Sequence, residues 1–327
     1  MDNGFVYNNK RYYREGLTLT LGATATTGYT AVFSANGTVI DGETYTVNST
    51  DGDVTVSVEW TENVLTLLNN DSAQPEGSKN ADIIAAAEAS GKTYNRVTLQ
   101  GRTLTKDGDW NTLCLPFAVN SFAGTPLEGA TVKELDATLS SLAGNTLTLK
   151  FKDATSIEAG KPYIIKWASG ANIVNPTFSN VTISSTTPTA VESYDHTVTF
   201  VGQYSPFSIV NSGATGDNEG NKNEILLMTK GNKIGYSKNP RTLNCFRCHF
   251  YVPTNGGQQA HSIEVDFGEG EATSVASMED EFATPHSALQ RRWKMEDVYY
   301  TLDGRKLEGK PTAKGMYIVN GRKVIIK

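Results

Sequence analysis

The sequence predicts an all-β protein made of two β-sandwich-like modules, a linker and a short β tail. Apolar and polar residues alternate with period two in segments 17–21, 54–58, 146–151 and 198–201, the pattern of strands with one buried face. Thr and Val are frequent in these segments, as they are in strands generally. Turn dipeptides follow one another about every 8–12 residues where they are densest: Asn36-Gly37, Asp41-Gly42, Asp51-Gly52, Asp107-Gly108 and Asn255-Gly256. This rhythm is typical of β-sandwiches.

One helix is expected, over residues 80–89. Asn80 is of a type that caps helix N-termini, Asp82 lies in the first turn, and Gly91 can end the helix. Because the segment is short and lies within a β pattern, we interpret it as a connector between strands.

Length and charge limit the classes of function. At 327 residues the chain is long enough for two domains. Its net charge of −6 creates no general attraction for nucleic acid, so no nucleic-acid partner is expected. No segment approaches the roughly 20 apolar residues of a membrane helix, so no transmembrane segment is expected. Residues 1–4 do not open a signal peptide, and we expect the chain to be the C-terminal portion of a longer protein or one without its leader.

The last thirty residues, 298–327, read VYYTLDGRKLEGKPTAKGMYIVNGRKVIIK and predict two or three short strands. Residues 300–327 resemble the end of the C-terminal sorting domains of exported Bacteroides/Prevotella-type proteins. The resemblance implies a type IX export machinery as partner and an extracellular or outer-membrane cell-surface location rather than the periplasm. The tail residues that would carry it are Asp303, Gly304, Arg305, Lys306, Lys314, Gly315, Asn320, Gly321 and Lys323.

Two further resemblances set the predicted boundaries. Residues 1–62 contain Tyr12 to Gly16, Gly28-Tyr29 and a closing D-x-x-V-x-V-x-x-x-W, and resemble the surface-protein repeat shared by Listeria and Bacteroides. Segments 108–117 and 157–167 resemble a β domain found towards the C-terminus of many Bacteroides surface and secreted proteins. We therefore predict four parts: a module at 1–62, a main domain at 63–270, a linker at 271–297 and a tail at 298–327.

The cysteines and histidines do not form a recognisable site. Residues 245–249 read C-x-x-C-H, a pattern that binds haem c and could supply half of a zinc site. On a strand, however, Cys245 and Cys248 would point to opposite faces, with Cys248 in the core. A second cysteine pair is missing, since Cys114 stands alone. We therefore expect a strand with a buried cysteine, and no metal or cofactor.

Other motifs favour an ordinary structural interpretation. Residues 86–93 match a relaxed P-loop, but a helix precedes the loop and a strand follows it, the reverse of a phosphate site. The oxygen-rich segment 217–224 has Lys222 and Met228 where a calcium loop of the EF-hand type needs glycine and glutamate, so a solvated hairpin tip is expected. No G-x-S-x-G or H-E-x-x-H occurs. We expect no catalytic residues and no enzyme activity.

Aromatic side chains provide the remaining candidates, because exposed Trp and Tyr rings stack on sugar rings. Six are available: Tyr12, Tyr13, Trp110, Trp167, Tyr204 and Tyr236. Trp110 follows the turn at Asp107-Gly108 and is expected near the mouth of a loop. Trp110 and Trp167 are the candidate ligand-binding residues, with burial in strands as the competing interpretation.

The sequence therefore predicts a non-catalytic C-terminal region of a bacterial cell-surface or secreted protein, a stalk or adhesion module with an export or anchoring tail. Its partner would be a glycan or a host or matrix protein. One alternative is a carbohydrate-binding module of a glycan-utilisation protein. Another is an accessory region of an enzyme whose catalytic domain lies upstream.

Overall fold

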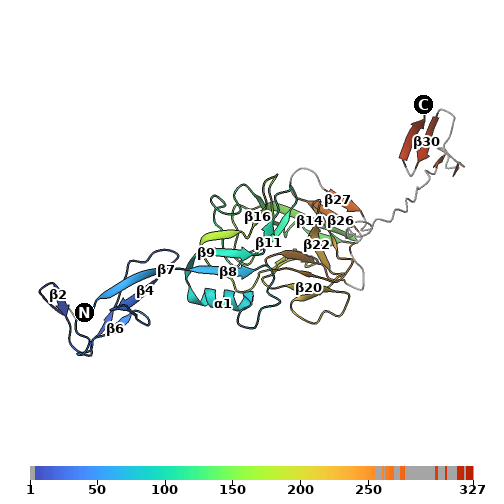
Figure 1. Ribbon diagram of the computed structural model, residues 1–327. Coiled ribbons are helices and arrows are strands. Elements are labelled where there is room, and N and C mark those ends of the chain that lie inside the picture. Colours follow the sequence, from blue (N-terminus) through green and yellow to red (C-terminus); the bar gives the residue numbers. More distant parts are fainter. Residues whose placement is uncertain are drawn as a thin grey trace, which may run out of the picture. The chain divides into compact units, whose positions relative to one another are not determined.

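The computed structural model describes residues 4–254, 260 and 262–268, and the backbone of strands at 273–276, 299–300, 306–307, 315–319 and 322–326 (Figure 1). The chain divides into two compact units, Met1–Glu281 and Phe282–Lys327. Strands dominate both, which confirms the all-β, sandwich-like class. Within the described ranges, no helix is long and apolar enough to span a membrane.

The strands of residues 4–62, called the N-terminal module here, pair only with one another. A hairpin, a strand pair and a three-stranded sheet of order β5-β4-β7 make up the module. Their bounds are β1 Phe5–Tyr7, β2 Lys10–Tyr12, β3 Thr18–Thr20, β4 Tyr29–Ala35, β5 Thr38–Val39, β6 Thr44–Thr46 and β7 Val56–Glu62. Asn8 and Asn9 both have positive φ between β1 and β2, as a tight two-residue hairpin turn requires.

A parallel strand pair with a crossover helix begins the main domain, the name used here for residues 63–268. Strand β8 (Val64–Leu68) runs parallel to β9 (Thr93–Gln100), and α1 (Asn80–Ser90) connects them. The helix buries Ile84 and Ala87 and ends at Gly91, whose φ of 59° is left-handed, so the predicted connector and its glycine stop are confirmed. Strand β17 (Thr177–Thr182) completes this sheet beside β9.

The predicted cap residue of α1 is wrong. Lys79 is the N-cap, and Asp82 Oδ2 accepts its backbone N–H at 3.2 Å. Asn80 is instead the first helical residue and is fully buried. Its side chain bonds the backbone N–H of Leu68 and the carbonyls of Leu68 and Tyr204. An amide that can both donate and accept satisfies buried backbone groups, which explains asparagine at this position.

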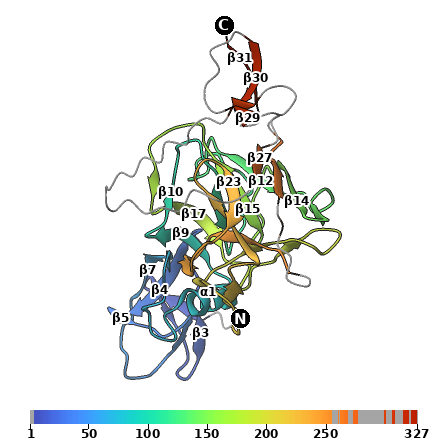
Figure 2. The ribbon, with the colours of Figure 1, turned by 90° about the vertical axis from the view of Figure 1, so that its right-hand side faces the viewer.

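Two larger sheets, some of whose strands are labelled in Figure 2, contact each other in the main domain. The first has the order β11-β15-β12-β14-β26-β27, with β13 also paired to β14. Its strands are β11 Asn111–Cys114, β12 Thr131–Leu135, β13 Ser141–Ala143, β14 Thr146–Asp153, β15 Pro162–Lys166, β26 Ser262–Asp266 and β27 Thr273–Ala276. The second, of order β18-β19-β25-β22-β23, contains β18 Val191–Glu192, β19 Thr199–Gly202, β22 Ile225–Thr229, β23 Lys233–Tyr236 and β25 Cys248–Tyr251.

Aromatic rings fill the space between these sheets. Phe200 and Phe250, on neighbouring strands of the second sheet, stack with their centroids 4.5 Å apart. Phe151 of β14 meets both edge-on and stacks on Phe267. The sandwich is thus closed by one continuous aromatic layer, whose rings are 0–5% exposed.

Smaller sheets complete the protein. The remaining main-domain strands pair as β10-β16 and β21-β20-β24, with bounds β10 Thr103–Leu104, β16 Ile173–Val174, β20 Phe207–Val210, β21 Glu219–Asn221 and β24 Arg241–Leu243. The second unit forms a sheet of order β29-β28-β30-β31, with bounds β28 Tyr299–Tyr300, β29 Lys306–Leu307, β30 Gly315–Val319 and β31 Arg322–Ile326. The described tail residues therefore form four strands rather than two or three. Strand β27 also lies inside the predicted linker.

Candidate functional site

The two tryptophans selected from sequence are not exposed platforms. Trp110 is 5% and Trp167 is 4% exposed. Trp110 stacks on Phe267 with centroids 5.3 Å apart, and Lys166 Nζ lies 4.5 Å from the centre of its ring. Trp167 directly follows β15, a strand with neighbours on both sides, and its indole N–H donates to the Glu128 carbonyl at 3.0 Å. Both rings are core side chains, so the expectation of exposure fails.

The other aromatic candidates separate by region. Tyr204 and Tyr236 of the main domain are 4% and 3% exposed, and their hydroxyls bond within the core. Tyr12 and Tyr13 of the N-terminal module behave differently: Tyr12 is 39% exposed and Tyr13 is partly buried. These two tyrosines line a groove.

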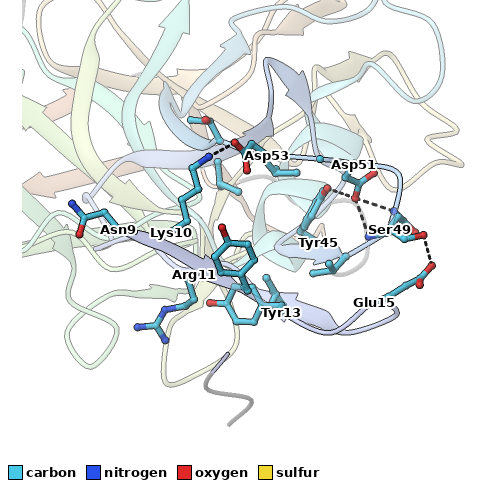
Figure 3. A pocket seen from close by; sticks show the side chains of 17 residues that line it. Asn9, Lys10, Arg11, Tyr13, Glu15, Tyr45, Ser49, Asp51 and Asp53 are labelled. Atoms are coloured by element: carbon cyan, nitrogen blue, oxygen red, sulfur yellow. Dashed lines mark hydrogen bonds and ion pairs between the residues drawn. The ribbon is translucent and has the colours of Figure 1, made fainter. Parts of the chain in front are cut away.

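The groove, called the N-terminal groove here, encloses about 800 Å³ between two segments of the N-terminal module (Figure 3). One wall is 9–15, which includes β2, and the other is 45–56, which runs from the end of β6 into β7. Leu19 adds to the lining. Its volume lies within the range of roughly 300–1,000 Å³ typical of small-ligand sites.

The lining of the groove combines apolar and polar side chains. Partly buried residues supply rings and aliphatic groups, namely Tyr13, Leu19, Tyr45, Val47 and Val54. Exposed residues surround them with charged and polar groups, namely Lys10, Arg11, Glu15, Asn48, Ser49 and Asp53. Tyr12 and Val56 of the lining are exposed as well, and Asp51 is partly buried. A lining that presents both kinds of group suits a ligand that has both an apolar face and polar edges.

Asp51 organises the segment on one side of the groove. Its Oδ2 accepts the Tyr45 hydroxyl at 2.6 Å, the Asn48 backbone N–H at 2.9 Å and the Asn48 side-chain amide at 3.2 Å. The Tyr45 hydroxyl, followed by the Asn48 N–H, lowers the pKa of Asp51, and the same bond raises the pKa of Tyr45. Asp51 is therefore an anion and Tyr45 is neutral at neutral pH.

Two contacts join the walls of the groove. Lys10 on β2 pairs with Asp53, which raises the pKa of Lys10 (Figure 3). The Ser49 hydroxyl donates to Glu15 Oε1 at 2.7 Å. In all, two cationic side chains lie among three carboxylates, so the groove carries both signs of charge with a slight acidic excess.

The C-x-x-C-H segment is buried, but not as one continuous strand. Phe246 has a φ of 59°, and β25 begins only at Cys248. Cys245 and Cys248 are both buried, so the segment holds two buried cysteines rather than one. Burial raises the pKa of the Cys245 thiol to about 12. Thiols kept protonated by burial are poor nucleophiles and poor metal ligands.

His249 is also a core residue. It is 2% exposed, stacks on Phe207 at 4.2 Å and has Nδ1 3.1 Å from Gln203 Oε1. Burial lowers its pKa to about 4. Across the part of the chain that the structure describes, His, Cys, Asp and Glu form no group of three suited to a metal ion.

The remaining sequence motifs are local structure. Residues 86–93 are the end of α1, its glycine stop and the start of β9, as predicted. In segment 217–224, Asp217 is exposed, whereas 219–221 form β21 beside β20, so the segment is more than a solvated hairpin tip. The Glu224 carboxylate accepts bonds from Thr254 and Asn221.

The predicted sorting residues lie largely outside the described residues. Lys306, Gly315 and Lys323 lie on β29, β30 and β31. The others are not described: Asp303, Gly304, Arg305, Lys314, Asn320 and Gly321. Their role in export stays a prediction.

Comparisons with known proteins assign no family to this chain, so a functional proposal rests on the chemistry of the site. No family model, curated protein or solved structure matches the chain. The N-terminal groove is therefore the basis for a functional proposal.

Sequence reasoning identified only part of this groove. Tyr12 and Tyr13 are candidate aromatics in the sequence and Asp51-Gly52 is a predicted turn. Nothing in the sequence, however, indicates that these residues line one groove. Segments 9–15 and 45–56 are separated by some thirty residues, and no periodic pattern shows that they lie together. The available signal was the clustering of Tyr, Asp and Asn in segments 9–13 and 45–53.

Proposed function

We propose that this chain is a non-catalytic region of a secreted or cell-surface protein that binds an extracellular ligand through the N-terminal groove. The observation that carries the proposal is an open groove of about 800 Å³ lined by Tyr12, Tyr13 and Tyr45 and by charges of both signs. The main domain, whose candidate aromatics all lie in its core, would serve as the stalk that carries the binding module.

The N-terminal module joins the main domain through a one-residue connection and several side-chain hydrogen bonds. Strand β7 ends at Glu62 and β8 begins at Val64, so one residue separates them. Glu62 accepts bonds from Arg96 Nε at 2.8 Å and Nη2 at 2.9 Å, and from the Asn95 side chain at 2.6 Å. The Asn63 amide donates to the Thr93 carbonyl at 3.1 Å.

The tail belongs to the same proposal. The resemblance of residues 300–327 to the end of sorting domains supports an export or anchoring role for the second unit. An extracellular or outer-membrane location follows from that role. The chain would then present its groove outside the cell, where glycans and host or matrix proteins are the available ligands.

An array of glycans and extracellular-matrix proteins tests the proposal with the intact chain. Ser49 is an exposed residue of the groove wall, and Ser49→Trp fills the space beside it. Ser169→Trp is the matched control, because Ser169 is exposed in a bend after β15. We expect saturable binding that Ser49→Trp removes and Ser169→Trp keeps. Binding that survives in Ser49→Trp, or a silent array, would contradict the proposal.

A further inference from the structure

We infer that the N-terminal groove binds a neutral oligosaccharide chain, an inference that rests on the proposed binding function of this groove. A sugar ring has two chemical aspects: faces made of C–H groups, and edges made of hydroxyls that both donate and accept hydrogen bonds. The groove offers a matching partner to each.

The apolar side chains of the groove match the apolar faces. Tyr13 and Tyr45 are partly buried, so their rings are held in place while part of each stays accessible. Leu19, Val47 and Val54 continue this apolar surface. Tyrosine provides a large, rigid contact area that loses little side-chain entropy on binding, and stacking on a ring face requires such rigidity.

The polar side chains of the groove match the hydroxyl edges. Glu15, Asp51 and Asp53 are carboxylates that can each accept several hydrogen bonds. Asp51 already accepts three bonds at Oδ2, and its Oδ1 accepts none among the contacts of the described residues. A hydrogen bond to a charged acceptor is stronger than a bond between neutral groups. Hydroxyl groups of a ligand therefore form strong hydrogen bonds with these carboxylates.

The charge of the groove lining argues against an acidic ligand. A sulfated or uronic chain, or a nucleic acid, would meet three carboxylates and only two cationic side chains. Lys10 is moreover already paired with Asp53, so an anion would have to break that pair. A neutral chain can bind without disturbing it.

The groove is also prepared for binding before a ligand arrives. Tyr45–Asp51 fixes the shape of the 45–56 segment, and Ser49–Glu15 connects this segment to the opposite wall. Fewer groups then need ordering when the ligand binds, which raises affinity. The volume of about 800 Å³ suits a short chain of sugar units rather than a single ion.

An extended peptide is the competing occupant. Among the described strands, β2 pairs only with β1 and β6 only with β3, and a peptide could add to such an edge. Peptide addition depends on backbone bonds, whereas sugar binding depends on the tyrosine rings and carboxylates. Side-chain variants therefore distinguish the two.

Affinity electrophoresis of the intact chain tests the inference. The gels contain soluble starch, laminarin, yeast mannan or xyloglucan as neutral probes, and heparin or polygalacturonate as acidic probes. We expect at least one neutral polysaccharide to retard the chain and neither acidic probe to do so. Tyr13→Ala should weaken the retarding interaction about tenfold. Tyr45→Phe, which keeps the ring and loses the bond to Asp51, should weaken it about threefold.

Tyr194→Ala is the matched control, since Tyr194 is 66% exposed in the main domain and its loss should change nothing. If Tyr13→Ala disturbs folding, Tyr45→Phe and Ser49→Trp still test the site. No retardation by any neutral probe overturns the inference, and so does heparin binding that Lys10→Met abolishes. A protein ligand on the array that Ser49→Trp removes, with silent gels, overturns the sugar inference alone. Retardation unchanged in all three groove variants overturns the groove itself, and with it the proposed function.

Discussion

The main domain and the N-terminal module use similar β-rich sequence to build different structures. In β15 of the main domain, residues 162–165 are buried and Lys166 is partly buried. In β7 of the module, six of seven residues are exposed, including Val56, Val58 and Trp60. In the main domain a second sheet packs over the first, whereas β7 of the module is mostly open to solvent. A strand's pattern of alternation specifies which residues share a face, but not whether anything covers that face.

This difference also divides the aromatics. Where two sheets meet, rings such as Phe200 and Phe250 become the core. Where a thin module leaves its strands half exposed, rings such as Tyr12 and Tyr13 line a groove instead. Aromatic rings thus stabilise the main domain but are available to a ligand in the N-terminal module. Four experiments test this contrast.

The largest expected effect comes from Phe250→Ala. Phe250 is fully buried and stacks on Phe200 at 4.5 Å, so truncation should lower the free energy of unfolding by about 3–5 kcal/mol. Trp60→Ala in the module removes a larger ring that is 38% exposed, and should cost only about 1 kcal/mol. Urea denaturation of both variants gives the comparison. Equal costs would show that the module has a core comparable to that of the main domain.

The second experiment uses pH. Burial lowers the pKa of His249 to about 4 from its ordinary 6.5, so between these values the unfolded chain binds a proton that the folded chain does not. The free energy of unfolding should therefore fall as pH drops from 6.5 to 4, by about 3 kcal/mol in all.

His249→Asn should flatten this dependence in urea denaturation series at several pH values. His196→Asn is the matched control, because His196 is 76% exposed and its φ of 56° suits asparagine. Identical pH profiles for wild type and His249→Asn would contradict the assignment of the effect to this core histidine.

The third experiment tests packing between strands. A Cβ at Gly202 on β19 would clash with the Cys114 side chain, whose Cβ would lie 2.7 Å away. Gly202→Ala should therefore cost about 1–3 kcal/mol through overpacking. Adding Cys114→Ala removes the sulfur and should recover part of that loss. No loss in the single variant, measured by thermal unfolding, would mean that this part of the core can relax.

The smallest effect is expected at the contact between the two regions. Arg96 and Glu62 form a paired salt bridge whose side chains are 57% and 31% exposed, and exposed pairs contribute little to stability. Arg96→Ala should lower Tm by no more than about 2 °C, with the difference shrinking as salt rises. A larger loss that persists at high salt would show that the junction is a firm interface.

Sequence patterns predicted the structural features that depend on residues close together in the chain. Alternation located strands close to β3, β14 and β19, and Gly91 located the end of α1 because its conformation favours glycine. These patterns failed where tertiary packing decides. Trp110 follows a turn, as predicted, yet Phe267 from far along the chain covers it. Asn80 has the chemistry of a cap, but buried backbone groups of Leu68 and Tyr204 bind its side chain.

The most direct test of this account is hydrogen exchange of the intact chain, alone and with each neutral polysaccharide of the panel at saturation. We expect slower amide exchange in segments 9–15 and 45–56 with the polysaccharide that retards the chain, and no change in β19 or β25. Protection confined to the main domain would contradict the claim that the N-terminal groove is the binding site.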